Sequence, residues 1–198
     1  MKRILPATAL LILAACSSAP PEAAKKPEPK VVEPVSAKKA FYLVYGAARM
    51  WAPDVQPARL ESMPVEGITP KDGKYGAWRV TFVSQTKGKV KIFTYSVIEA
   101  SASLHEGVFA VGEEAYTGNP RQFYVQAIKI DSDAALKTAE EKSVEYLKKN
   151  AAKPVFMQLE FTKLYPEPAW RVLWGDSVST SDHSIYVSSS TGDYLGKS

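Results

Sequence analysis

The densest group of reactive side chains lies near the C-terminal end, over residues 176–184, with the sequence Asp-Ser-Val-Ser-Thr-Ser-Asp-His-Ser. This run contains every residue type of a Ser–His–Asp triad, in which the histidine accepts the proton of the attacking hydroxyl and the carboxylate orients the histidine. Members of a triad converge from separate elements, whereas consecutive residues of a strand or loop point in different directions. The run also lacks a Gly-x-Ser-x-Gly elbow. We therefore interpret it as a polar hairpin loop between Trp174 and Ile185, with a hydrolase that uses Ser177–Ser184 and His183 as the alternative.

Metal and acid–base chemistry have few candidate residues. His105 and Glu106 could begin a metal site, but the second of the two histidines, His183, lies far along the chain. A single cysteine excludes an intramolecular disulfide and any metal site with several thiolates. Glu113-Glu114 and Glu160 could serve as general acid and base, although nothing in the sequence fixes the distance between them. The sequence predicts no catalytic residues, no metal and no cofactor.

Aromatic residues favour a core or a binding surface over a reaction site. Trp78 and Trp170 lie in alternating segments, which favours packing between a helix and a sheet over a ligand or peptide groove. The segment 165–168 is a rigid, proline-flanked approach to the last hairpin, and it is either an exposed contact surface or a structural turn. The candidate binding surface predicted from the sequence consists of Tyr165, Pro166, Glu167 and His183.

The charge balance excludes one class of partner. The 198 residues include 25 Lys and Arg against 21 Asp and Glu, which gives a net charge of +4. A nucleic-acid-binding protein that neutralises many phosphates needs a larger excess of positive charge. We therefore expect no nucleic-acid partner.

The N-terminus has the pattern of a secretory signal peptide, residues 1–15. A basic start, Met1-Lys2-Arg3, precedes an apolar stretch that is about half as long as the ~20 residues needed to span a bilayer. The stretch ends in Leu13-Ala14-Ala15-Cys16, which resembles the lipobox of bacterial lipoproteins. The resemblance implies cleavage between Ala15 and Cys16, acylation of Cys16 with diacylglycerol and palmitate, and a lipid bilayer as partner.

The residues after the cysteine refine the expected location. An aspartate after the acylated cysteine is the usual signal for retention in the inner membrane, whereas this chain has Ser17. The resemblance therefore implies a lipid-anchored protein of the cell envelope, on the outer membrane and facing the periplasm if the host has two membranes. Residues 17–37 contain five prolines among Ala, Lys and Glu, and they have too few bulky apolar side chains to offset the entropy of ordering. We expect residues 16–37 to be a lipidated cysteine followed by a disordered tether.

From residue 38 onward the patterns are those of a folded α+β protein. Two helices are expected, one over residues 40–51 with Ser36 as N-cap and Pro53 as the stop, and one from Asp131–Asp133 to Asn150. Alternation of apolar residues predicts the strands, with a hairpin turn at Lys87-Gly88. The predicted strands cover residues 78–82, 90–98, 108–111, 123–130, 155–161, 170–174 and 185–187.

A short repeat suggests that the folded part is duplicated. Ala77-Trp78-Arg79-Val80 recurs as Ala169-Trp170-Arg171-Val172, and each copy continues to a second aromatic residue, Phe82 or Trp174. Each copy also follows a helix and an extended segment, so the order helix–strand–strand–strand is expected twice. The repeat predicts two related lobes, one at residues 38–121 and one at residues 122–198.

The second lobe, residues 122–198, resembles the PepSY and PepSY-like domains of bacterial envelope proteins. The resemblance rests on residues 130–136 leading into the helix, 168–172 in a strand, and 185–195 with their Thr191-Gly192 turn. Ser188-Ser189 stand where the family commonly has an acidic residue. The resemblance implies a cystatin-like helix packed on an antiparallel sheet, in a domain that binds or inhibits peptidases or other envelope partners.

The sequence thus predicts a membrane-anchored, non-catalytic envelope lipoprotein that acts as a protein- or peptide-binding or peptidase-modulating module. Its expected partner besides the bilayer is an envelope protein or peptide. Two alternatives remain open, the hydrolase described above and a structural spacer or assembly scaffold that the tether positions.

Overall fold

The computed structural model describes residues 32–102 and 104–198. The signal peptide predicted at residues 1–15, the cleavage site between Ala15 and Cys16, the lipidated Cys16 and most of the tether lie outside the described residues. No helix in the described part is long and apolar enough to cross a membrane.

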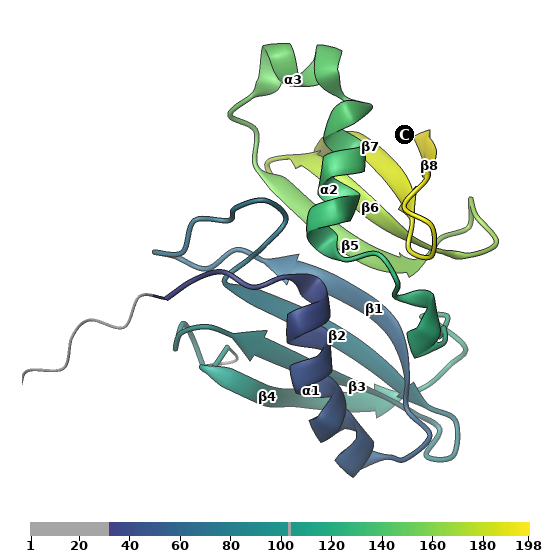
Figure 1. Cartoon of the computed structure of the whole chain (residues 1–198). Coiled ribbons are helices and arrows are strands. Elements are labelled where there is room, and N and C mark those ends of the chain that lie inside the picture. Colours follow the sequence, from purple (N-terminus) through teal and green to yellow (C-terminus); the bar gives the residue numbers. More distant parts are fainter. Residues whose placement is uncertain (1–31, 103) are drawn as a thin grey trace, which may run out of the picture. The chain divides into compact units, whose positions relative to one another are not determined.

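Eight antiparallel strands form one continuous sheet in the order β4-β3-β2-β1-β5-β6-β7-β8 (Figure 1). Strands β1 to β4 span Gln56–Met63, Ala77–Ser84, Lys89–Ser96 and Gly107–Ala115. Strands β5 to β8 span Val155–Phe161, Pro168–Gly175, Ser181–Ser188 and Tyr194–Lys197. The helices are α1 (Ala37–Trp51), the short 3-10 helix η1 (Val125–Ala127), α2 (Ser132–Glu141) and α3 (Val144–Asn150). Helix α1 contacts β2 and β3, and α2 contacts β6 and β7.

The predicted fold class, α+β with a helix packed on a small PepSY- or cystatin-like sheet in two related lobes, is wrong. The chain forms mostly a single eight-stranded antiparallel sheet with three short α-helices. The reason is the pairing of β1 with β5, which joins the strands of the two halves edge to edge. The two copies of the repeat lie in β2 and β6, each next to one of these central strands. An internal duplication stays a prediction.

Strand β1 was not predicted from the sequence, although it is central. Ala58, Leu60 and Ser62 are buried on one face, while Arg59 and Glu61 alternate with them on the other. The polar face carries its own partners: Arg59 Nε donates a hydrogen bond to Glu160 Oε2 at 2.6 Å, and Gln158 Nε2 donates to Glu61 Oε1 at 2.9 Å. These cross-strand bonds stabilise the β1–β5 pair on the face that lacks a tryptophan core.

The predicted caps of both helices are confirmed, and the two helix starts are joined. Ser36 Oγ accepts from the backbone N–H of Lys39 at 3.4 Å, and Asp131 caps α2 by accepting from Ser132 N at 2.7 Å. Asp131 Oδ1 also accepts from the backbone N–H of Lys38 at 2.9 Å, and Ser132 Oγ accepts from Ala37 N at 3.0 Å. Each of these bonds satisfies an N–H group that has no partner within its own helix.

The end of the predicted tether also contacts the folded part. Val35 is buried and exchanges backbone hydrogen bonds with Tyr75 at 2.9 and 3.0 Å. The Trp78 indole N–H donates to the carbonyl of Val35 at 2.9 Å. The last residues before α1 are therefore held against the sheet.

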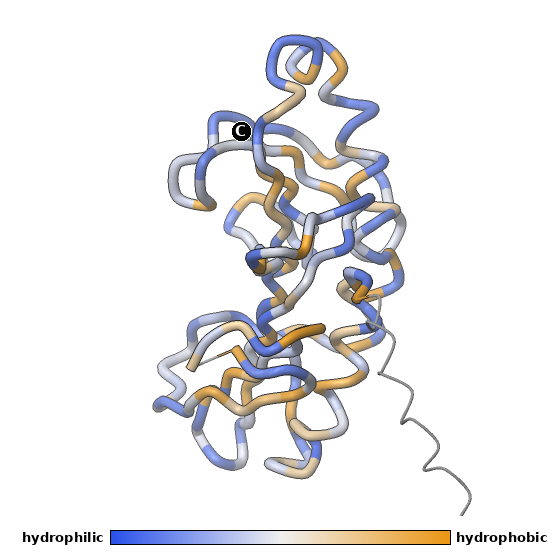
Figure 2. The backbone as a smooth tube through the Cα atoms, turned by 90° about the vertical axis from the view of Figure 1, so that its left-hand side faces the viewer, coloured by the Kyte–Doolittle hydropathy of each residue, from blue (hydrophilic) through white to orange (hydrophobic). Residues whose placement is uncertain are grey.

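The prediction that the alternating tryptophans form the core is confirmed. Trp78 and Trp170 are fully buried, and their rings meet at 6.4 Å with an interplanar angle of 72°, the edge-to-face geometry that aromatic pairs favour. The Trp170 indole N–H donates to the carbonyl of Ile130 at 3.0 Å. Hydrophobic and hydrophilic residues change over short distances along the chain rather than in long blocks, as expected for strands with one covered face (Figure 2).

Two other predicted elements differ from the structure. The strand expected at residues 123–130 is wrong, because Phe123 makes one backbone bond, to the carbonyl of Pro57 at 2.8 Å, before the chain turns into η1. The second helix is interrupted at Lys142 and Ser143, which separate α2 from α3. The interruption places the Ser143 side chain toward β7, where its Oγ lies 2.9 Å from His183 Nε2.

Strands β4 and β8 form the two edges of the sheet. The register of β4 shifts opposite Ile92 and Phe93, so that Val111 falls between the paired residues Ala110 and Gly112. A second shift, between Tyr186 and Val187, interrupts the pairing of β7 with β8. Both edges are therefore irregular.

We expect Trp170→Ala to destabilise the whole described unit by about 3–5 kcal/mol, because truncation of a fully buried indole leaves a cavity. Urea unfolding followed by circular dichroism and by tryptophan fluorescence should give one coincident transition at a lower midpoint. Tyr124→Ala is the control, since Tyr124 is 74% exposed and its truncation should cost less than about 0.5 kcal/mol. Two separate transitions, of which the substitution moves only one, would contradict the continuous sheet.

Candidate functional site

The residues of the predicted binding surface do not come together. The ring of Tyr165 lies tilted by 53° against that of Tyr186, with centroids 5.3 Å apart, and Glu167 Oε2 accepts a hydrogen bond from Ser188 Oγ at 2.8 Å. Ser188 pairs with Ala169 at one end of β7, whereas His183 pairs with Trp174 at the other end. Tyr165, Pro166 and Glu167 are thus separated from His183 by the length of a strand.

His183 lies against the junction of α2 and α3. Its Nε2 is 2.9 Å from Ser143 Oγ, and its ring stacks on Tyr146 with centroids 4.4 Å apart and an interplanar angle of 13°. Burial lowers the pKa of His183 below its ordinary value, and the positive charge of Lys197 lowers it further. Ser143 is itself only 2% exposed, whereas His183 is half-buried on β7.

The hydroxyl-rich run bonds within itself instead of forming a triad. Ser177 Oγ lies 3.0 Å from Ser179 Oγ and 2.8 Å from Thr180 Oγ1. Asp182 forms an ion pair with Lys153 at 2.9 Å. The structure therefore gives His183 a partner outside this run. The predicted polar hairpin loop is confirmed only for residues 176–180, because Ser181–Ser188 form β7 and His183 lies on that strand.

The other candidate residues for chemistry are held in separate local networks. His105 Nδ1 lies 2.6 Å from Glu99 Oε1 in an exposed turn. Glu113 on β4 binds Lys89 and accepts from the Trp51 indole N–H at 3.0 Å, while Glu160 on β5 pairs with Arg59. Three strands separate β4 from β5, so Glu113 and Glu160 cannot share a proton. Within the described ranges, no group of three or more His, Cys, Asp or Glu side chains could hold a metal ion.

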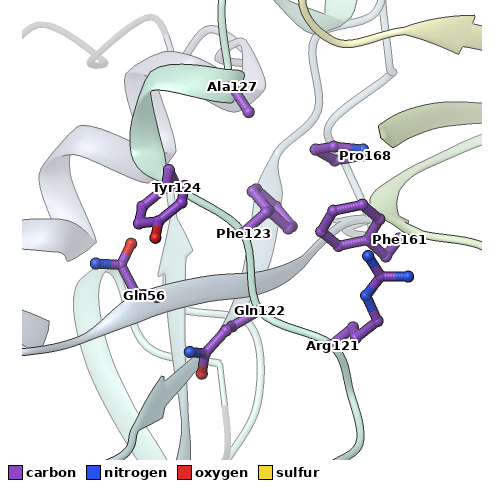
Figure 3. A pocket seen from close by; sticks show the side chains of 8 residues that line it. All are labelled: Gln56, Arg121, Gln122, Phe123, Tyr124, Ala127, Phe161 and Pro168. Atoms are coloured by element: carbon purple, nitrogen blue, oxygen red, sulfur yellow. The ribbon is translucent and has the colours of Figure 1, made fainter. Parts of the chain in front are cut away.

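An open cavity of about 320 Å³ lies where the two halves of the sheet meet (Figure 3). It is bounded by the start of β1, the segment before η1, the end of β5 and the start of β6. We call it the junction pocket, and its lining residues are Gln56, Arg121, Gln122, Phe123, Tyr124, Ala127, Phe161 and Pro168.

Two aromatic rings form the apolar part of the junction pocket. Phe123 is buried and meets Phe161 edge to face, with centroids 6.2 Å apart and an interplanar angle of 75°. The bond from Phe123 N–H to the carbonyl of Pro57 fixes this segment to β1. Tyr124, in contrast, is 74% exposed beside the opening.

Arg121 supplies positive charge to the junction pocket. Its guanidinium carbon lies 3.8 Å from the centroid of the Phe161 ring, within the range of a cation–π contact. None of the ion pairs found among the described residues involves Arg121. The cation is thus held in place by an aromatic ring rather than by a carboxylate.

Two glutamines add polar groups to the junction pocket. The Gln56 Oε1 atom is buried and has no hydrogen-bond partner in the described part of the chain. Gln122 Oε1 accepts from Gln85 Nε2 at 3.0 Å, which ties the pocket to the β2–β3 turn. Asp54 holds that turn, since its carboxylate accepts from Thr86 N at 2.8 Å and from Ser84 Oγ at 2.7 Å. These bonds, that to Thr86 foremost, lower the pKa of Asp54 to about 2.

The junction pocket was not predicted from the sequence. Arg121 and Phe161 lie 40 positions apart, and the sequence divides residues 121–124 between a polar loop and the strand predicted from residue 123. One local signal is Pro57, since a proline within a strand is typical of the start of the strand or of a bulge. It indicates an irregular strand start next to Gln56 but does not indicate a pocket.

Comparisons with known proteins give one structural likeness. No protein-family model matches the chain, and no curated protein matches it in sequence. The chain is similar to a solved structure described as that of an inferred lipoprotein from Clostridium difficile 630, with a TM-score of 0.52 and 10% sequence identity. The match covers 80% of this chain and 91% of that chain. At this identity the likeness concerns the fold alone, and the predicted resemblance to PepSY domains gains no support.

We expect the environment of His183 to make the stability of the protein depend on pH. The folded state disfavours the protonated ring, so the unfolded chain binds more protons as the pH falls. The contribution of the neutral His183 ring to the free energy of unfolding is therefore fully present above the ordinary histidine pKa of about 6.5. It is lost as the pH falls below that value. Calorimetry should show Tm falling between about pH 7 and pH 5.5.

His183→Gln should flatten this dependence, because glutamine can still bond to Ser143 but does not titrate. His105→Gln, in an exposed turn, is the control and should leave the slope in place. A slope that survives His183→Gln would assign the pH dependence to other groups.

Proposed function

We propose that this chain is a lipid-anchored lipoprotein of the cell envelope, and that its non-catalytic role is to bind a peptide or protein through the junction pocket. The anchor is Cys16, in the lipobox-like sequence Leu13-Ala14-Ala15-Cys16. The description of the structurally similar Clostridium difficile protein as an inferred lipoprotein supports this assignment. Ser17 favours the outer membrane, facing the periplasm if the host has two membranes.

The junction pocket is the observation that carries the binding role. Ligand sites are concave, mostly apolar and supplied with a few convergent polar groups, and cavities of roughly 300–1,000 Å³ are typical. The junction pocket combines two phenylalanine rings with the cation of Arg121 and the unpaired oxygen of Gln56. An exposed tyrosine beside the opening adds a surface on which a peptide can pack.

The lipid anchor is tested by Cys16→Ser in the full chain. A serine hydroxyl is not the acceptor for diacylglycerol, so the variant should leave the membrane fraction and take up no labelled palmitate. Several acyl chains hold a protein durably on a bilayer, since each buried CH₂ contributes about 0.8 kcal/mol. Ser17→Ala is the matched control and should stay in the membrane fraction. Retention of Cys16→Ser with the membrane would refute the anchor.

The binding role is tested by filling the junction pocket. Ala127 lines it, so Ala127→Trp should occupy the cavity and abolish saturation-transfer NMR signals from a pool of random heptapeptides. Gln126→Trp is the matched control, because Gln126 is exposed in the same turn and does not line the cavity. Signals that persist in Ala127→Trp, or that are absent in the unmodified chain, would count against the proposed role.

A further inference from the structure

We propose that the junction pocket recognises the C-terminal end of a peptide, with the terminal carboxylate on Arg121 and a backbone N–H on Gln56. This inference rests on the proposed binding role and names its ligand. It follows from the contact of the Arg121 guanidinium with Phe161, the missing hydrogen-bond partner of Gln56 Oε1 and the volume of the cavity.

The stacking of Arg121 leaves its hydrogen-bond donors available. A guanidinium that stacks on a ring uses its flat face, whereas its N–H groups lie in its plane. The contact with Phe161 therefore fixes the orientation of Arg121 without using its donors. A carboxylate matches such a planar fork and can accept two parallel hydrogen bonds from it.

The charge of Arg121 has no carboxylate partner among the described residues and is available to an anionic ligand. The ion pairs among residues 32–102 and 104–198 engage other arginines, such as Arg59 with Glu160, but not Arg121. A fixed cation beside an apolar cavity favours a ligand that carries a negative charge next to an apolar body. The terminal carboxylate of a peptide and its last side chain have this combination.

Gln56 adds a requirement for a donor. The buried amide oxygen of Gln56 has no partner, which is costly, and a rotation of this side chain toward the cavity would let it accept a backbone N–H of a peptide. Figure 3 shows Gln56 and Arg121 on opposite sides of Phe123, with the ring between them. An extended chain advances up to about 3.3–3.6 Å per residue, so a peptide with its carboxylate at Arg121 presents N–H groups of its last residues toward Gln56.

The size of the cavity limits the ligand to a short end of chain. A volume of about 320 Å³ is at the low end of ligand sites, which suits the last one or two side chains but not a long segment. The residue before them would meet Tyr124, which is 74% exposed at the opening. These features favour a chain terminus over an internal loop.

The test compares two probes on the full chain in mild detergent, by isothermal titration calorimetry. The probes are acetyl-Ala-Ala-Phe with a free carboxylate and the same peptide with a C-terminal amide. We expect the acid to bind at least about tenfold more tightly than the amide, since a charge-assisted pair is lost in the amide. Equal affinity for acid and amide, or no binding of either, would overturn the inference.

Substitutions test which residues make the acid bind more tightly than the amide. Arg121→Gln should lower the affinity for the acid to that for the amide, and Arg121→Lys should restore only part of the difference because lysine lacks the planar fork. Lys163→Gln removes an equal charge two residues after Phe161, outside the pocket lining, and should leave the ratio unchanged. Gln56→Met should weaken both probes by a similar factor, about tenfold. A preference for the acid that survives Arg121→Gln would also overturn the inference.

The outcome separates this inference from the proposed role. Arg121 is exposed, so Arg121→Gln should keep the thermal unfolding of the unmodified chain. If random heptapeptides bind in a way that Ala127→Trp abolishes, but acid and amide bind equally, the binding role stands and the carboxylate assignment falls. If neither the pool nor the tripeptides bind, both fall.

Discussion

Residues Arg59–Glu61 of β1 pair with Gln158–Glu160 of β5 at the centre of the sheet, and this short antiparallel contact joins the two halves of the chain. The contact is supported on both faces. On the helix-covered face, Trp78 and Trp170 meet edge to face and exclude water. On the other face, Arg59 and Glu160 form an ion pair. A half-exposed pair of this kind contributes little alone, so the buried indoles carry most of the stabilisation. Asp131 accepts hydrogen bonds from the N–H groups of Lys38 at the start of α1 and of Ser132 at the start of α2. This shared cap links the halves through N–H groups that would otherwise bond to water.

The junction pocket is a geometric consequence of the same pairing. Gln56 begins β1, and Phe161 ends β5, so the two strands deliver their terminal residues to one place. The segment 121–124 crosses there on its way from the first half to the second, fastened by the bond from Phe123 to Pro57. Arg121 is thus carried to the ring of Phe161 by the connection itself. A ligand in the junction pocket would touch elements of both halves, so its binding would favour the joined sheet.

Local features of this fold could be predicted from the sequence, and its central contact could not. Trp78 and Trp170 follow a period of two, Ser36 and Asp131 are helix caps, and Gly88 closes a hairpin with a positive φ of 62°. These signals depend on neighbours in sequence. Strand β1 also alternates, but Leu60 is the one large apolar residue among its inward positions 58, 60 and 62, so the signal is weak. Its polar side chains Arg59 and Glu61 are bonded by residues of β5 about a hundred positions away. The predicted fold class was therefore wrong, because it depends on the pairing of β1 with β5, which lie far apart in the sequence. The junction pocket escaped prediction for the same reason, since Arg121 and Phe161 meet only in the folded chain.

The two edge strands of the sheet, β4 and β8, each have one unpaired side, and such an edge can pair with the edge strand of another molecule. The irregular register at Val111 interrupts the row of free backbone groups on β4, and the four-residue β8 offers only a short template with its own shift in register. Glu114, exposed near the end of β4, adds a negative charge to this edge. These defects disfavour edge-to-edge pairing between copies of the chain and so guard against the growth of fibrous aggregates.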